Sequence, residues 1–239
     1  MQCLVLAGGL ATRMRPVTRT LPKALVPVGG RPFADLQLAW LAEQGVSDVV
    51  YAIGHLGGLL REFAGDGSRW GLRIRYVDEG EHLRGTGGAL RLAYDEGALE
   101  PVFAVLYGDS YLSLDLGALF AEFDAARPHV LMTLFRNDGA FDRSNARLHD
   151  GSVVYDKTVT DPASRGMRHI DYGLSIIDRD KVVASLAPGA TIDLSDVYRE
   201  LSLAGRVAGV EVHRRFYEIG SPEGLAALEG HLAAREEVR

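Results

Sequence analysis

Short apolar segments alternate with helical patterns through the first 110 residues, and this alternation constrains the fold more than any other feature. The expected strands are Cys3–Ala7, Asp48–Ile53, Leu72–Val77 and Val102–Leu106. Each precedes a segment with the spacing of an amphipathic helix. Parallel strands need crossover connections, and helices cover both faces of such a sheet. The sequence therefore predicts an α/β fold with a doubly wound, mostly parallel, Rossmann-like sheet.

The pattern changes after about residue 110. Asp150-Gly151 stands between two apolar runs, which predicts a β-hairpin over residues 145–155. Further strands are expected at His129–Phe135, Tyr172–Ile177 and Val207–Val212, and helices at Leu114–Ala126, Ser195–Ala204 and Ser221–Arg235. Since no linker or repeat interrupts the sequence, we expect one domain over residues 1–239, with a small hairpin-containing half added to the parallel half.

Charge is distributed unevenly along the chain. The net charge of −6 argues against nucleic acid as the main partner. No acidic residue precedes Asp35, and four cations follow the first expected strand closely. They are Arg13, Arg15, Arg19 and Lys23. The single cysteine, Cys3, is interpreted as a small buried hydrophobe in a reducing compartment. With no secretory leader and no apolar run of about 18 residues, a soluble cytoplasmic protein is expected.

The first strand runs directly into Gly8-Gly9, where bare backbone N–H groups can face a ligand. A strand, a glycine turn and clustered cations together predict an anion site, and the natural anion is a polyphosphate. The alternative is an ordinary tight turn beside solvated cations. The pattern is neither a P-loop nor a dinucleotide fingerprint, because the glycine and lysine spacings of both motifs are missing.

The segment from Leu6 to Val28 resembles the signature of the sugar-1-phosphate nucleotidyltransferases. It matches at Leu6-Ala7-Gly8-Gly9, Thr12-Arg13, Pro16, Thr18, Pro22-Lys23 and Pro27-Val28. It departs at Ala11, where the family usually has glycine; alanine costs little there unless the residue needs a positive φ. The resemblance implies a nucleotide-diphospho-sugar transferase fold. It also implies that Leu6, Ala7, Gly8, Gly9, Arg13 and Lys23 contact the nucleotide.

Later segments extend the resemblance. Gly85-Thr86-Gly87 is similar to the family segment that lies against base and ribose, although it could be an ordinary helix start. Gly108-Asp109 follows an apolar strand, where a carboxylate is placed to hold Mg²⁺; a surface turn is the alternative. The family has its Mg²⁺ ligand at this position. Glu218 stands where the family has an aspartate as second metal ligand.

The expected sugar-phosphate site lies in the second half. Lys157 resembles the lysine that binds the sugar phosphate, although Thr158 replaces the usual proline and a lone lysine is normally just solvated. Tyr172-Gly173 resembles a sugar-side segment in which Ser175 replaces an expected aromatic residue. Asn145 either faces the sugar or is a turn residue.

The resemblance implies a Mg²⁺-dependent sugar-1-phosphate nucleotidyltransferase of the short type, without hexapeptide repeats. Arg13, Lys23 and Asp109 would be its catalytic residues. Residues 1–110 would bind the nucleoside triphosphate and residues 111–239 the sugar 1-phosphate, without nucleic acid or membrane; a homodimer stays open. GTP with mannose- or heptose-1-phosphate is favoured. The alternatives are a UTP, CTP or dTTP enzyme, such as a MurNAc-1-phosphate uridylyltransferase, and a non-catalytic nucleotide-sugar sensor, which the departures at Ser175 and Glu218 would permit.

Overall fold

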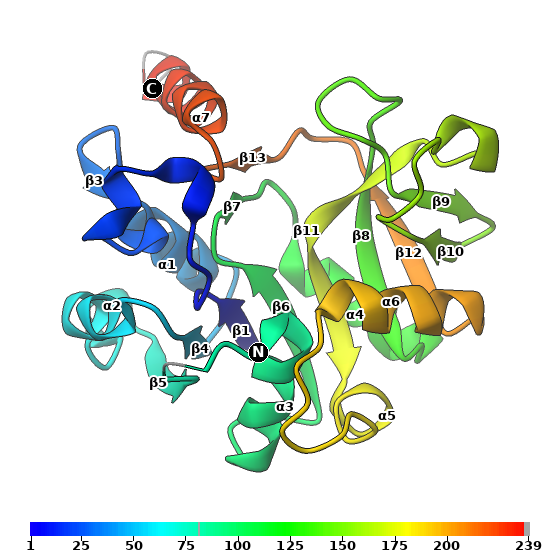
Figure 1. Cartoon of the computed structure of the whole chain (residues 1–239), viewed down its shortest axis with the longest axis horizontal. Helices are drawn as coiled ribbons and strands as arrows, with labels where there is room; N and C mark the ends of the chain where they lie inside the picture. The colour runs from blue at the N-terminus through cyan, green and yellow to red at the C-terminus, as the bar shows by residue number, and fades with distance from the viewer. Residues whose placement is uncertain (81, 237–239) are drawn as a thin grey trace. The chain divides into compact units, whose positions relative to one another are not determined.

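The computed structural model describes residues 1–80 and 82–236, which form two compact units (Figure 1). The first unit combines Met1–Leu83, Leu106–Leu112 and Phe216–Arg239. The second contains Arg84–Val105 and Ser113–Arg215. The chain therefore leaves the first unit twice and returns to it for its last helix.

The first unit is built on three parallel strands in the order β5-β4-β1. They are β1 (Gln2–Leu6), β4 (Asp48–Ile53) and β5 (Arg73–Asp78). Residues 49–53 of β4 are at most 1% exposed, as expected for a central strand covered on both faces. On the edge strand β5, exposed Arg73 and Arg75 alternate with buried Ile74. Cys3 is fully buried, and burial raises the pKa of its thiol, so it is the inert hydrophobe that was predicted.

Helices and short hairpins complete this unit. The α-helices are α1 (Phe33–Glu43), α2 (Gly57–Ala64) and α7 (Pro222–Glu236). The 3₁₀ helices are η1 (Thr12–Met14), η2 (Val17–Arg19), η3 (Lys23–Leu25) and η4 (Ser68–Trp70). The two-residue strands pair as β2 (Pro27–Val28) with β3 (Arg31–Pro32) and as β7 (Ser110–Tyr111) with β13 (Tyr217–Glu218). These 3₁₀ helices and two-residue strands were not predicted, because they are too short to carry a periodic pattern.

A hydrophobic cluster fixes α7 to the segment that follows β1. Its buried members are Met14, Val26, Val28, Phe33, Ile219 and Leu228. Ile219 is fully buried and directly follows Glu218, whereas Met14 directly follows Arg13. The same cluster therefore positions two residues that the sequence assigned to the site.

The second unit contains a mixed sheet. Its strands, in spatial order, are β6 (Val102–Tyr107, of which residues 106 and 107 count with the first unit), β11 (His169–Asp178), β8 (Val130–Arg136), β12 (Val207–Val212), β10 (Ser152–Tyr155) and β9 (Ala146–His149). β12 runs parallel to β8, whereas the β11–β8, β10–β12 and β10–β9 pairs are antiparallel. Its helices are α3 (Gly85–Asp95), α4 (Leu116–Ala126), α5 (Arg179–Val182), α6 (Leu194–Leu203) and the 3₁₀ helix η5 (Ala163–Arg165).

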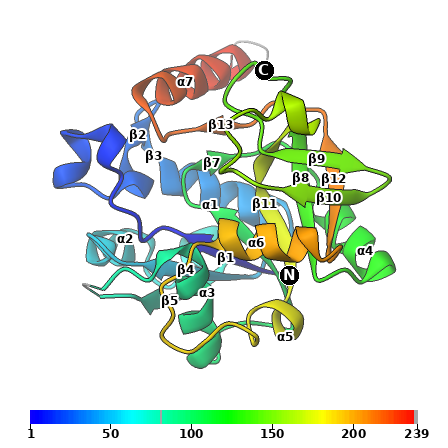
Figure 2. The same cartoon turned by 45° about the vertical axis from the view of Figure 1, so that its right-hand side comes forward.

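The predicted hairpin is confirmed. Asp150 and Gly151 have φ of 48° and 74°, as a two-residue turn with positive φ at both positions requires. Figure 2 shows β9 and β10 side by side with α6 close to them. Ser202 on α6 accepts a hydrogen bond from the Tyr155 N–H at 3.0 Å, so the helix is fastened to the end of β10.

The expected α/β fold is thus confirmed, with parallel strands in the first unit and a hairpin-containing second unit. Several boundaries differ. β11 begins at His169, three residues before the predicted Tyr172, because His169 pairs with both Arg136 and Ala146. Helix α5 was not predicted, since it lasts one turn and depends on Asp178 capping its N-terminus. Within residues 1–80 and 82–236, no helix is long and apolar enough to cross a bilayer.

Candidate active site

Gly8 lies where the loops after three parallel strands meet. A Cβ on Gly8 would stand 2.6 Å from Glu79 Oε2, just beyond β5, and 3.4 Å from the Gly54 nitrogen, just beyond β4. A side chain at residue 8 would therefore displace the end of the Glu79 side chain and touch the backbone after β4. Gly9, in contrast, is exposed and its Cβ would meet nothing within 4 Å. The carboxyl ends of these strands form the edge at which an open α/β sheet binds ligands.

Ala11 adopts the left-handed conformation, with φ 47° and ψ 44°. Its carbonyl accepts hydrogen bonds from the Thr18 hydroxyl at 2.8 Å and the Met14 N–H at 3.1 Å, which hold the turn closed. Because residue 11 has a positive φ, an alanine in place of the family's glycine lowers the stability of the folded protein. Thr18, which is 2% exposed, is a structural member of the signature.

We expect Ala11→Gly to stabilise the protein. The substitution removes the steric cost of about 1–2 kcal/mol that an L-residue pays in the left-handed conformation. Part of this gain is lost, because glycine loses more conformational entropy than alanine on folding. A net gain of up to about 1 kcal/mol should raise the melting temperature by roughly 2–4 °C in calorimetry. Gly9→Ala is the control for chain entropy alone, since Gly9 has no positive φ and open space around it, and it should stabilise the protein by about 0.4–1 kcal/mol. A lower melting temperature for Ala11→Gly would show that the turn is not strained.

Lys23 and Asp109 form an ion pair in the first unit. Lys23 Nζ donates to Asp109 Oδ2 at 2.9 Å, and the two side chains are 21% and 23% exposed. Lys23 opens η3 directly after Pro22, and Asp109 lies between β6 and β7. Two residues 86 positions apart in sequence, both predicted to be catalytic, therefore lie in contact.

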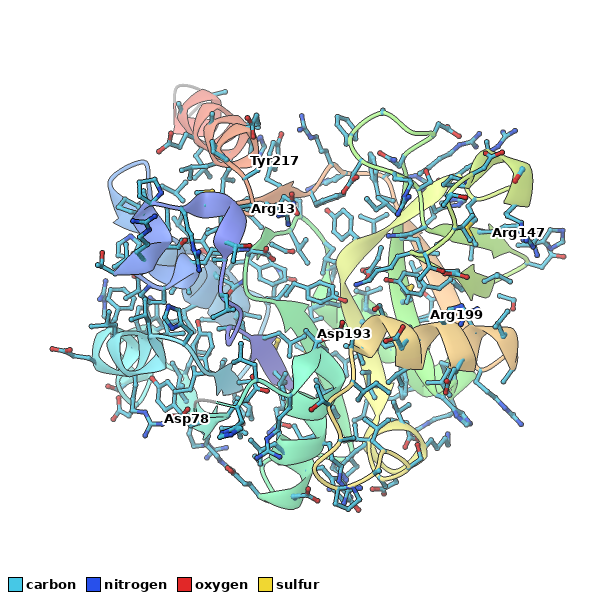
Figure 3. The ribbon with its side chains drawn as sticks, viewed as in Figure 1. Arg13, Asp78, Arg147, Asp193, Arg199 and Tyr217 are labelled. Atoms are coloured by element: carbon cyan, nitrogen blue, oxygen red, sulfur yellow. The ribbon has the colours of Figure 1, made fainter. Side chains whose placement is uncertain are left out.

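Glu218 and Arg13 converge on the same place. A Cβ on Gly220 would lie 3.4 Å from Arg13 Nη2, 3.4 Å from Glu218 Oε1 and 3.5 Å from Asp109 Oδ2. Pairing of β13 with β7 places Glu218 opposite Ser110, and the Ile219 N–H donates to the Asp109 carbonyl at 3.0 Å. Figure 3 labels Arg13 next to Tyr217 of β13. The result is a cluster of two cations and two carboxylates around Gly220.

The carboxylate pair has the donor chemistry that magnesium uses. Mg²⁺ is usually held by one or two carboxylates, with phosphate oxygens and water completing its shell. In the described part of the chain, no group of three or more His, Cys, Asp and Glu side chains could hold a metal alone. Asp109 and Glu218 therefore fit an ion that arrives with a polyphosphate.

The predicted base- and ribose-binding residues lie in the second unit, at the start of α3. The Gly87 N–H donates to the Ile192 carbonyl at 2.9 Å, and Thr86 Oγ1 accepts from the Leu194 N–H at 2.8 Å. A Cβ on Gly85 would stand 2.7 Å from the Ile192 oxygen. These contacts give Gly85, Thr86 and Gly87 a structural role against the loop before α6. Their contact with a nucleotide stays a prediction.

On the predicted sugar side, Asn145 joins three strands. Its Oδ1 accepts from the Asp171 N–H at 3.0 Å, its N–H donates to His169 at 2.9 Å, and its carbonyl accepts from Asp156 at 2.9 Å. Lys157 is exposed and directly follows Asp156. Asn145 is therefore at least a structural residue, and any contact with a sugar stays a prediction.

Asp156 rigidifies the turn that carries Lys157. Its carboxylate accepts from the Thr158 N–H at 2.8 Å, the Thr158 hydroxyl at 2.6 Å and Arg199 Nε at 2.9 Å. Burial raises the pKa of Asp156, but these hydrogen bonds and the Arg199 charge outweigh it and hold the pKa below its usual value. Thr158 thus stiffens the turn at the position where the family has proline.

Tyr172 and Gly173 lie in the interior of β11. Tyr172 is fully buried, and its hydroxyl accepts from the Ser113 N–H at 3.3 Å. Gly173 has φ of 99° at an irregularity between Asp171 and Ser175, a position that needs glycine. The Ser175 hydroxyl, which is buried, hydrogen-bonds the Tyr198 hydroxyl. An aromatic side chain from α6 therefore contacts Ser175, the position where the family has an aromatic residue.

Sequence reasoning missed Gln37 and Glu79, which are 2% and 9% exposed. Glu79 follows β5 and lies against Gly8. Gln37 lies on the buried face of α1, four residues after Phe33 and four before Leu41. The sequence held one signal for Gln37: it is a polar residue at a position where the helical spacing predicts an apolar one.

The chain belongs to the nucleotidyl transferase family. The family model described as "Nucleotidyl transferase" matches residues 2–141, more than half of the chain. The predicted resemblance is therefore confirmed at the level of the family.

Individual relatives differ in their named substrates. Mannose-1-phosphate guanylyltransferase of Mycobacterium tuberculosis is 29% identical, over 92% of this chain and 61% of that protein. N-acetylmuramate alpha-1-phosphate uridylyltransferase of Neisseria meningitidis is 27% identical, over 92% of this chain and 94% of that protein. HddC from Yersinia pseudotuberculosis shares the fold, with a TM-score of 0.77 at 21% identity over 97% of this chain and 99% of that chain. Matches with several curated relatives span only 32% to 61% of their length.

Proposed function

We propose that this protein transfers a nucleoside monophosphate from a nucleoside triphosphate to a sugar 1-phosphate and releases pyrophosphate. The observation that carries the proposal is the cluster around Gly220, in which Arg13 and Lys23 meet the carboxylates of Asp109 and Glu218. Clustered cations beside two carboxylates suit a triphosphate with its magnesium ion. The sugar-1-phosphate transferase activities named for the relatives support the same reaction.

The reaction needs positioning and charge stabilisation, without a covalent intermediate. Asp109 and Glu218 would hold Mg²⁺, which supplies positive charge to the phosphate oxygens. Arg13 would hold the triphosphate, and Lys23 would bridge the phosphates around the reacting phosphorus. Lys23 is now the counter-ion of Asp109. Phosphate oxygens would compete for its ammonium group, so nucleotide binding would free the Asp109 carboxylate for the metal.

For the substrates we propose GTP with mannose 1-phosphate or heptose 1-phosphate. Relatives named for these guanylyltransferase activities support this choice, including the heptose enzyme of Campylobacter jejuni at 33% identity over half of this chain. A uridylyltransferase acting on MurNAc 1-phosphate is the second candidate, because the Neisseria relative matches along 92% of this chain.

Pyrophosphate release is the direct test. The purified protein is incubated with Mg²⁺ and each pairing of GTP, UTP, CTP and dTTP with mannose, heptose, glucose and MurNAc 1-phosphates. We expect release with one nucleotide and one sugar phosphate far above the others. If no pairing releases pyrophosphate while calorimetry detects nucleotide or nucleotide-sugar binding, the protein is a sensor rather than an enzyme. If nothing binds at millimolar concentration, the proposed function is wrong.

The two predicted substrate sites should respond to different substitutions. We expect Arg13→Ala mainly to raise KM for the triphosphate and Lys157→Ala mainly to raise KM for the sugar phosphate, each by about ten-fold for a lost charged hydrogen bond. Steady-state kinetics with each substrate varied in turn would measure both effects. Arg147→Ala is the control for an exposed cation of the second half. Equal effects of both substitutions on both KM values would contradict this assignment of substrates.

A further inference from the structure

Gln37 contacts the backbone on both sides of Asp109. Its Nε2 donates to the Tyr107 carbonyl at 3.3 Å and to the Ser110 carbonyl at 3.2 Å. Gly108 and Asp109 lie between these two acceptors. One amide group of α1 thus spans the loop that presents the Asp109 carboxylate.

The chemistry of this contact calls for a primary amide. A single amide nitrogen carries two hydrogens, one for each carbonyl, and an oxygen in its place would face two acceptors. Gln37 Oε1 is buried and has no hydrogen-bond partner among the described residues. Burying an unpaired amide oxygen is unfavourable, whereas the amide nitrogen pairs two backbone carbonyls that a leucine could not reach. The amide at this position therefore acts on the loop of residues 107–110 and not on helix packing alone.

The loop is fixed from other directions as well. The Gly108 N–H donates to the Leu6 carbonyl at 3.0 Å, which ties the loop to the end of β1. The Asp109 carbonyl accepts from Ile219 at 3.0 Å, which ties it to the segment carrying Glu218. Without Gln37, the Tyr107 and Ser110 carbonyls lose a side chain that joins them across Asp109. The backbone hydrogen bonds to Leu6 and Ile219 would remain, and the side-chain link between residues 107 and 110 would be lost.

We propose that Gln37 is a positioning residue that sets the backbone of residues 107–110 so that the Asp109 carboxylate meets the metal and Lys23. The inference rests on the proposed function, because it assumes that Asp109 is a metal ligand. Residues that orient metal ligands typically contribute about 10- to 100-fold in metal affinity or activity.

Gln37→Leu and Gln37→Glu separate this role from simple packing. Gln37→Leu removes both donors, and we expect kcat to fall about 10- to 100-fold and the Mg²⁺ requirement to rise, with a much smaller change in KM for the sugar phosphate. Gln37→Glu keeps the shape, but only its protonated form can donate. Burial favours that neutral form, so activity relative to wild type should fall as pH rises. The Leu variant should lack this pH dependence.

Leu41→Ala is the control for loss of packing on the same helix, since Leu41 is fully buried on α1. It should lower the melting temperature and leave the Mg²⁺ requirement unchanged. If Gln37→Leu does not fold, the pH profile of Gln37→Glu decides alone. Wild-type kcat, Mg²⁺ requirement and pH profile in both variants would overturn the inference.

Metal titration without turnover keeps this test independent of the proposed reaction. Mn²⁺ binding in the presence of a non-hydrolysable nucleotide, followed by electron paramagnetic resonance, should be about ten-fold weaker in Gln37→Leu than in wild type. An inactive wild type that binds Mn²⁺ in this Gln37-dependent way would refute the proposed reaction and retain the positioning role. Equal binding by both proteins would refute the positioning role.

Discussion

Lys23→Ala is expected to lower turnover by about two to three decades while leaving the protein folded. A charge directed at a reacting phosphoryl group is worth roughly 3–4 kcal/mol in the transition state. The structural loss is a separate effect. The Lys23–Asp109 pair is only about a fifth exposed on each side, so removing the ammonium leaves a mostly buried carboxylate unpaired and should also lower the melting temperature. The measurement is kcat beside the melting temperature.

Two further measurements identify the cause. Arg19→Ala removes an exposed cation from the same loop, outside the Gly220 cluster, and should change kcat little. Lys23→Ala should also bind Mn²⁺ more tightly in the absence of nucleotide, because Asp109 no longer has a competing ammonium at 2.9 Å. A variant with near-wild-type kcat and a lowered melting temperature would show that Lys23 is only structural.

The sequence predicted the parts of the fold that depend on local pattern. The strands over residues 48–53 and 207–212 and the Asp150-Gly151 hairpin were predicted closely, since continuous apolar runs and a specific turn pair encode them. The Lys23–Asp109 ion pair was not predicted, although topology brings the loops that follow parallel strands to one edge of the sheet. What could not be predicted depends on tertiary contacts between distant segments. Gln37 is one example, since its hydrogen bonds to the carbonyls of residues 107 and 110 form only in the folded protein.

Departures from the family signature have local structural partners here. Thr158 replaces proline but is fastened to Asp156 by two hydrogen bonds, and Ser175 replaces an aromatic residue but hydrogen-bonds Tyr198 from α6. Ala11 is held in its left-handed turn by Thr18. The structure around each departure therefore accommodates it, and none of the three departures indicates a decayed site.

Of the departures from the family signature, Glu218 is the one predicted to bind the metal. Its backbone, like those of the other departures, has close structural neighbours. A Cβ on Gly224 would stand 2.3 Å from the Glu218 carbonyl, so α7 packs directly on this backbone. The Ser221 hydroxyl accepts from the Gly224 N–H at 3.1 Å and helps to fix the start of α7. Glu218 Oε1 lies near the same Gly220 position as Asp109 Oδ2. The longer side chain thus starts from a backbone against which α7 packs and reaches the same place as the Asp109 carboxylate.

We therefore expect Glu218→Gln to cut kcat by at least about ten-fold and to raise the Mg²⁺ requirement. The substitution keeps the shape and removes the negative charge that a Mg²⁺ ligand supplies at about 2.0–2.1 Å. Glu218→Asp should be milder, since a shorter carboxylate can still act through a bridging water. Glu223→Gln, an exposed change of the same charge in the first turn of α7, is the matched control and should leave the Mg²⁺ titration unchanged. If Glu218→Gln keeps full activity at unchanged Mg²⁺ dependence, Asp109 is the protein's metal ligand without Glu218, and the two-carboxylate assignment is wrong.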